Sequence, residues 1–153
     1  MRRAYPRPGG TRDVPHTGAV MPNASLAAMS AEHETQIKLL DDLGSAVSQG
    51  ESNSGLRNLL NQLIDFTEMH FVSEQSLMRR QGYPGYEAHV LEHDRLIREV
   101  RRLEAALHDG GPAGEVLPKL RDWLVGHIET ADEAFVLYMD RETAAGMGAG
   151  ATS

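Results

Sequence analysis

Hydrophobic residues recur at alternating three- and four-residue steps through most of this 153-residue chain. That spacing keeps one side of an α-helix apolar, because an α-helix has about 3.6 residues per turn. Four such stretches predict helices at about residues 23–49, 54–81, 86–108 and 113–143. Glycine and proline residues interrupt the pattern between them. Four helices with short connections predict an all-α fold, an antiparallel up-down-up-down four-helix bundle.

The two ends of the chain lack this periodicity. Residues 1–22 contain four prolines and three glycines, and cannot bury enough apolar surface to offset the entropy of ordering. We interpret them as a disordered or loose N-terminal arm, and the glycine- and alanine-rich residues 144–153 as a flexible C-terminal tail. The bundle is then one domain, residues 23–143, as expected for a chain of this length.

Composition narrows the class of protein. The net charge is −7 and the basic residues are scattered, so no basic face for nucleic acid is evident. Cysteine is absent, which excludes disulfides, thiolate metal sites and cysteine nucleophiles. Arg2 and Arg3 are not followed by the apolar run of a signal peptide, and no segment is apolar enough to span a membrane. We therefore expect a cytoplasmic protein that binds neither nucleic acid nor membrane.

Histidines occupy positions on the apolar stripes where leucine is expected. A buried histidine must find a partner, and hydrogen bonding inside the core explains one such residue. It does not explain five, each on a predicted helix and accompanied by two carboxylates. The combination predicts a metal site in the bundle core. The seven residues are His33, His70, Glu74, His89, His93, His127 and Asp132.

The spacing of these residues indicates two metal ions. Residues four apart on a helix differ by about 40° and rise by about 6 Å, so His89 and His93 can bind one ion from one side. The pair of His70 and Glu74 has the same spacing. Seven ligands exceed the number that a zinc site takes. Imidazole suits iron, copper, nickel or zinc, whereas bridging carboxylates suit a pair of irons.

His127 and Asp132 have a different spacing. They are five residues apart, which offsets them by about 140° in a regular α-helix, too far to chelate one ion together. We therefore expect Asp132 to reach across to a neighbouring metal. Two ions bridged by Glu74 and Asp132 account for all seven ligands.

At this point the sequence resembles a known family. The stretch from Phe66 through His70 to Glu74, the loop at Tyr83, the His89-x-x-x-His93 pair and the stretch Trp123-Leu-Val-Gly-His127-Ile-x-x-x-Asp132 resemble hemerythrins, in particular bacterial ones. The resemblance covers roughly residues 25–140. It implies a non-haem centre of two iron ions, Fe2+ or Fe3+, that binds dioxygen reversibly.

The resemblance also implies a division of labour among the ligands. His89, His93 and His127 hold one iron, which is coordinatively saturated. His33 and His70 hold the other, which keeps an open position. Glu74, Asp132 and an oxo or hydroxo group bridge the two irons. The candidate walls of an oxygen pocket are Gln36, Phe71, Trp123, Leu124 and Ile128. Of these, Gln36 departs from the family, which usually has an aliphatic residue there.

Several roles use the same seven side chains. An oxygen carrier, store or sensor is our main hypothesis, with dioxygen as the partner. The same centre as an enzyme acting on peroxide or nitric oxide is an alternative. A third hypothesis is an oxygen- or redox-responsive interaction module, and a fourth a zinc-filled structural bundle.

Overall fold

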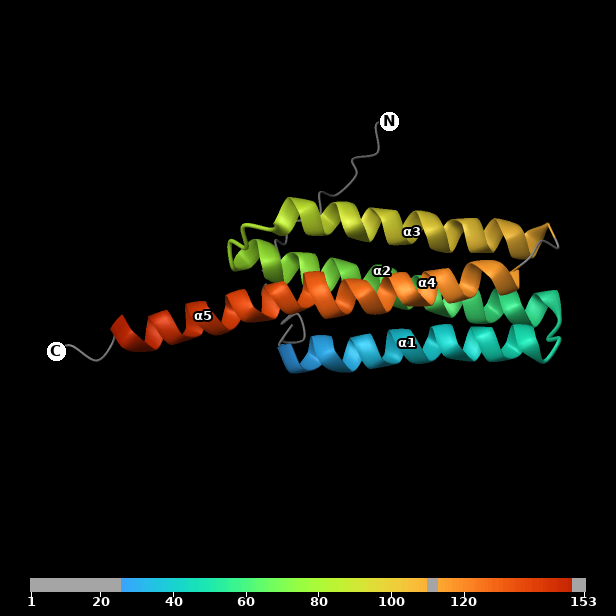
Figure 1. Cartoon of the computed structure of the whole chain (residues 1–153), viewed down its shortest axis with the longest axis horizontal. Coiled ribbons are helices and arrows are strands. Elements are labelled where there is room, and N and C mark those ends of the chain that lie inside the picture. Colours follow the sequence, from blue (N-terminus) through green and yellow to red (C-terminus); the bar gives the residue numbers. More distant parts are fainter. Residues whose placement is uncertain (1–25, 110–112, 150–153) are drawn as a thin grey trace, which may run out of the picture.

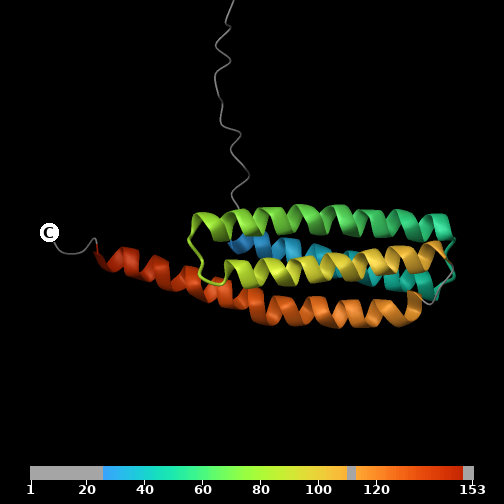
Figure 2. The same ribbon diagram turned by 90° about the horizontal axis from the view of Figure 1, so that it is seen from above.

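The computed structural model describes residues 26–109 and 113–149, and these form a four-helix bundle (Figures 1 and 2). The fold predicted from the periodicity is confirmed. Two further segments, η1 and α5, continue the fourth helix. The elements are α1 (Leu26–Ser48), α2 (Asn53–Arg80), α3 (Tyr86–His108), α4 (Ala113–His127), η1 (Ile128–Asp132) and α5 (Glu133–Ala149).

Successive helices run in opposite directions, so that each packs against two neighbours. The main contacts join α1 to α2 and α4, and α3 to the same two helices. After α1 the chain turns through Gly50, whose φ of 71° suits a residue without a side chain. The hydroxyl of Ser52 then accepts a hydrogen bond from the Gly55 amide and caps α2. Gly82, with a φ of 62°, follows α2.

The fourth helix differs from its prediction in two ways. A π-helical segment, η1, interrupts it, and the Glu133 amide donates to the Ile128 carbonyl five residues earlier. The helix also continues to Ala149, beyond the boundary predicted near residue 143. Six residues assigned to a flexible tail are therefore helical, and Figure 1 shows α5 extending past the ends of the other helices.

Two apolar clusters enclose a polar layer within the bundle. The smaller consists of Met29, Leu77, Met78 and Phe135, near the α2–α3 connection. The larger fills the rest of the bundle from that layer to the opposite end. Its buried members are Leu40, Leu43, Leu56, Leu60, Leu63, Ile64, Phe71, Leu96, Val100, Leu103, Leu107, Leu117, Leu120 and Leu124. This arrangement keeps the polar layer between two apolar volumes.

The proposed N-terminal arm, residues 1–22, lies outside the described residues. Within the described part of the chain, no helix combines the length and apolar character that crossing a membrane requires.

Candidate metal centre

All seven predicted ligands meet in the polar layer between the two apolar clusters. Six are buried, with at most 4% of each exposed, and the His33 side chain is 13% exposed. Each helix of the bundle contributes, because each places a ligand on its inward stripe. His33 comes from α1, His70 and Glu74 from α2, His89 and His93 from α3, His127 from α4 and Asp132 from η1.

The ligand atoms form two overlapping groups. In each group every donor atom lies within 4.8 Å of the others, which is compact enough to surround one ion. The larger group consists of Glu74, His89, His93, His127 and Asp132. The smaller consists of His33, His70, Glu74 and Asp132. The two carboxylates belong to both groups, so the cluster has the composition of two adjoining sites.

Each carboxylate turns one oxygen toward each group. Glu74 Oε2 lies 3.4 Å from His70 Nε2, and Glu74 Oε1 lies 3.2 Å from His93 Nε2. Asp132 Oδ2 lies 2.9 Å from His33 Nε2, and its Oδ1 lies 3.1 Å from His127 Nε2. A carboxylate that offers one oxygen to each of two sites has the arrangement that a bridge requires.

The π-helical segment explains how Asp132 reaches the cluster. In a regular α-helix a residue five positions after His127 points elsewhere, which is why we expected Asp132 to reach across to a neighbouring metal. The premise of a regular α-helix was wrong, because residues 128–132 form a π-helix. The wider turn of η1 returns Asp132 to the side of the helix that carries His127, and both residues belong to the larger group. The second carboxylate oxygen of Asp132, Oδ2, lies beside His33 of the smaller group as well.

Unpaired buried atoms indicate that the cluster fits cations. Among the described residues, four buried side-chain atoms have no hydrogen-bond partner, and three of them belong to His33, Glu74 and Asp132. Burying such atoms without a partner is costly, and a metal ion satisfies them all. Imidazole nitrogen and carboxylate oxygen together are suitable donors for iron.

The charges in the cluster support the same conclusion. Burial acts to raise the pKa of Glu74, but the four histidines beside it lower that pKa far below its ordinary value. The pKa of Asp132 is lowered in the same way, against the effect of burial. Burial acts to lower the pKa values of His33 and His89, yet the two carboxylates raise both to about 9. Protons on these histidines therefore balance two buried negative charges when no metal is present.

Comparison with known proteins identifies the family. The family model described as the hemerythrin HHE cation binding domain matches residues 24–137. The chain belongs to the hemerythrin family. It is 32% identical to a bacteriohemerythrin of Methylococcus capsulatus over 106 residues, 68% of this chain and 80% of the relative. It is 34% identical to a myohemerythrin of Sipunculus nudus, over 62% of this chain and 78% of the relative.

A solved hemerythrin has the same fold. A crystal structure of wild-type hemerythrin matches with a TM-score of 0.65 and 31% identity, covering 71% of this chain and 85% of that one. The family assignment predicted from the ligand pattern is thus confirmed by sequence and by structure.

Three residues of this hemerythrin-family protein were missed from sequence, and each orients a histidine. Glu32 accepts a hydrogen bond from His70 Nδ1 at 2.7 Å, and Glu92 accepts one from His127 Nδ1 at 2.6 Å. Gln75 lies 2.9 Å from His93 Nδ1. Such partners fix the ring so that Nε2 faces the metal position. Each adjoins a predicted ligand in sequence, but so do many solvated residues.

We expect Glu92→Ala to weaken metal binding about ten- to hundredfold, because His127 loses the acceptor that fixes its ring. Competition against a chelator of known affinity measures the change. Glu99→Ala is the matched control on α3, since Glu99 accepts a hydrogen bond from Arg102 at the surface. Equal metal affinity in the two variants would argue against an orienting role for Glu92.

The predicted apolar wall residues lie against the histidines. Phe71 is buried and stacks on the His93 ring at a centroid distance of 3.6 Å. Trp123 stacks on His127 at 5.3 Å with nearly parallel planes. Leu124 is buried in the larger apolar cluster, and Ile128 packs against it. These contacts surround the cluster with apolar groups, whereas a role in an oxygen pocket stays a prediction.

A small cavity of about 160 Å³ reaches the cluster from the surface. His33, Ile128 and Asp132 are among the residues that line it. The cavity explains why His33 is more exposed than the other six residues. A ligand the size of a diatomic molecule fits this volume.

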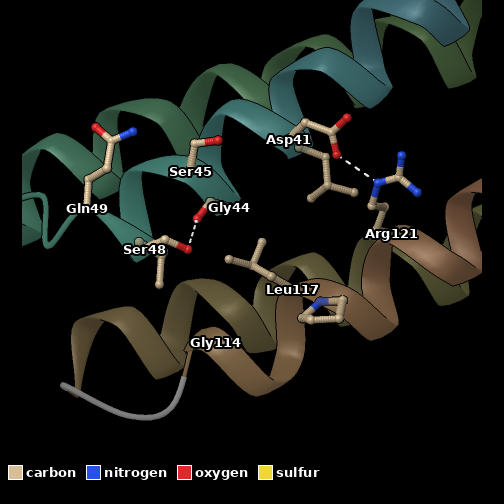
Figure 3. Close-up of a pocket in the computed structure, with 11 residues that line it drawn as sticks. Asp41, Gly44, Ser45, Ser48, Gln49, Gly114, Leu117 and Arg121 are labelled. Atoms are coloured by element: carbon tan, nitrogen blue, oxygen red, sulfur yellow. Dashed lines mark hydrogen bonds and ion pairs between the residues drawn. The ribbon is translucent and has the colours of Figure 1, made fainter.

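A second hollow lies apart from the centre. A groove of about 560 Å³ runs between α1 and α4, with the Asp41–Arg121 ion pair at one side and Gly44 and Gly114 along its length (Figure 3). None of the seven predicted ligands lines it. His108, excluded as a ligand from sequence, is exposed at the end of α3 and lies 3.3 Å from Asp109.

Proposed function

We propose that this protein is a non-haem di-iron protein that binds dioxygen reversibly. The observation that carries the proposal is the division of the carboxylate oxygens, one to each group of histidines. Two irons held by this donor set supply reversible dioxygen binding when they are reduced. The family relationship supports the choice of iron over zinc.

The two groups differ by one ligand, and this difference defines where dioxygen binds. Five donor atoms surround one position and four surround the other. A solvent oxygen shared between two bound ions would raise these numbers to about six and about five. The position that His33 and His70 would hold then has one place for a ligand. His33, one of the two histidines at this position, lines the surface cavity.

The chain's other residues keep the site suitable for binding without further reaction. Phe71 and Trp123 cover two histidines with aromatic rings and limit the access of water. Glu32 and Glu92 hold the ring orientation through charge-assisted hydrogen bonds. A rigid and largely apolar enclosure favours release of the bound gas over proton-dependent chemistry.

Oxygen exposure of the reduced protein tests the proposal. Iron-loaded protein, reduced without air, should gain a visible absorption band when dioxygen is admitted, lose it under vacuum and regain it on re-exposure. Metal analysis should give about two irons per chain, matching the two groups of donors. Zinc-loaded protein is the control and should show no band. Irreversible oxidation of the iron protein without the band contradicts the proposal.

A further inference from the structure

Gln36 is a buried residue whose side chain is only half satisfied. It is 1% exposed, and its Nε2 donates a hydrogen bond to Thr67 Oγ1 at 3.1 Å. Its Oε1 has no partner among the described residues. A buried carbonyl oxygen without a donor is unfavourable, so its retention calls for a ligand that supplies one.

The two residues form a distinctive pair. In the part of the chain that the structure describes, Gln36 and Thr67 are the buried polar residues that remain once the seven predicted ligands are set aside. They bond to each other across the α1–α2 contact, 31 residues apart in sequence. The rest of the surrounding core is apolar, with Leu40 and Leu63 nearby along the same helices.

The pair lies about one helical turn from His33 and His70, the two histidines of the smaller group. Gln36 follows His33 by three residues on α1, and Thr67 precedes His70 by three residues on α2. Because α1 and α2 are antiparallel, both steps lead in the same direction, a rise of about 4.5 Å. The His33 and His70 rings are themselves in contact, with centroids 4.8 Å apart. The Gln36–Thr67 pair is therefore the next layer below the His33–His70 pair.

We propose that Gln36 Oε1 accepts a hydrogen bond from a small ligand at the metal position held by His33 and His70. The site then prefers small ligands that carry an N–H or O–H group over similar ligands that carry none. In the structure the amide nitrogen faces the Thr67 hydroxyl, which leaves the amide oxygen free. Gln36 acts as a residue that determines ligand specificity. This inference rests on the proposed di-iron function.

Two anions that share a linear frame of three heavy atoms test the preference. Azide has no proton, whereas the hydrogen cyanamide anion has a similar frame and one N–H. Optical titration of the oxidised iron protein gives both dissociation constants, and their ratio cancels general changes in affinity. We expect Gln36→Leu to shift the ratio about tenfold toward azide, the effect of one lost hydrogen bond. Gln36→Met should do the same, and Thr67→Val should produce a smaller shift.

Gln62→Leu is the matched control, because Gln62 is exposed on α2. It should leave the ratio unchanged. An unchanged ratio in Gln36→Leu and Gln36→Met, with iron content intact, overturns the inference and leaves the di-iron function standing. A shift toward cyanamide overturns it as well, since it means that the amide nitrogen is the free atom. Wild-type protein without two irons overturns the proposed function, and this inference with it.

Discussion

Replacing Glu74 with alanine is expected to remove both metal ions. Glu74 is fully buried, and its two oxygens lie close to histidines of both groups. The substitution takes one oxygen donor from each position and halves the negative charge that the metals neutralise. The iron content should fall from about two per chain to near zero, because a missing ligand costs more than the ten- to hundredfold loss that a missing supporting residue causes. Metal analysis of protein purified from iron-replete cells measures this.

Two further variants make the result interpretable. Glu74→Gln keeps the shape of the side chain but removes its charge and one acceptor oxygen, and we expect it to lose iron as well. Glu68→Ala, on the same helix, removes an exposed carboxylate that pairs with Arg101 at the surface. This control should keep both irons. If Glu74→Ala retains about two irons, Glu74 is not the shared ligand and the assignment of the centre is wrong.

For residues on regular helical stripes, the sequence was enough to predict the helix and the direction of the side chain. Helix α3 begins and ends at Tyr86 and His108, as the unbroken periodicity of its leucines predicted. The inward direction of the predicted ligands was predictable for the same reason, because a histidine at a leucine position on such a stripe must face the core. His89 and His93 are the simplest case, since four-residue spacing on a regular helix fixes both distance and direction.

The features that sequence could not provide depend on contacts between helices. Glu32 and Glu92 are partly exposed and follow the pattern of solvated charges, and only the neighbouring helix makes each a partner of a histidine. Gln36 was noticed as a polar residue in an apolar place, but its pairing with Thr67 depends on how α1 packs on α2. Local periodicity contains no information about such pairs.

The π-helical segment is the clearest limit on prediction from periodicity. The sequence around Thr130 gives no strong helix-breaking residue, and a regular α-helix was the expectation there. The Thr130 hydroxyl donates a hydrogen bond to the Gly126 carbonyl, one turn earlier. Contacts made by the residues at the start of the π-turn and by those after it stabilise the turn. His127 and Asp132 enter the metal cluster together, while Phe135 enters the smaller apolar cluster.

Moving the carboxylate by one residue tests whether this π-turn is required. In a regular α-helix position 131 lies four residues after His127 and shares its face, whereas in the observed structure position 132 does. We therefore expect the double variant Ala131→Asp/Asp132→Ala to lose as much iron as Asp132→Ala alone. Ala131→Asp by itself is the control and should keep about two irons, since Asp132 is still present.

The double variant can recover the centre only if η1 becomes a regular α-helix, and packing opposes that change. Removing the extra residue of the turn rotates α5 by about 100° relative to α4. Phe135, which is fully buried, would then leave the smaller apolar cluster. Exposing a phenylalanine costs about 1.5–3 kcal/mol, a large share of the stability of a small domain. If the double variant nevertheless holds two irons, the carboxylate tolerates either register, and the π-turn is not what directs Asp132 to the metals.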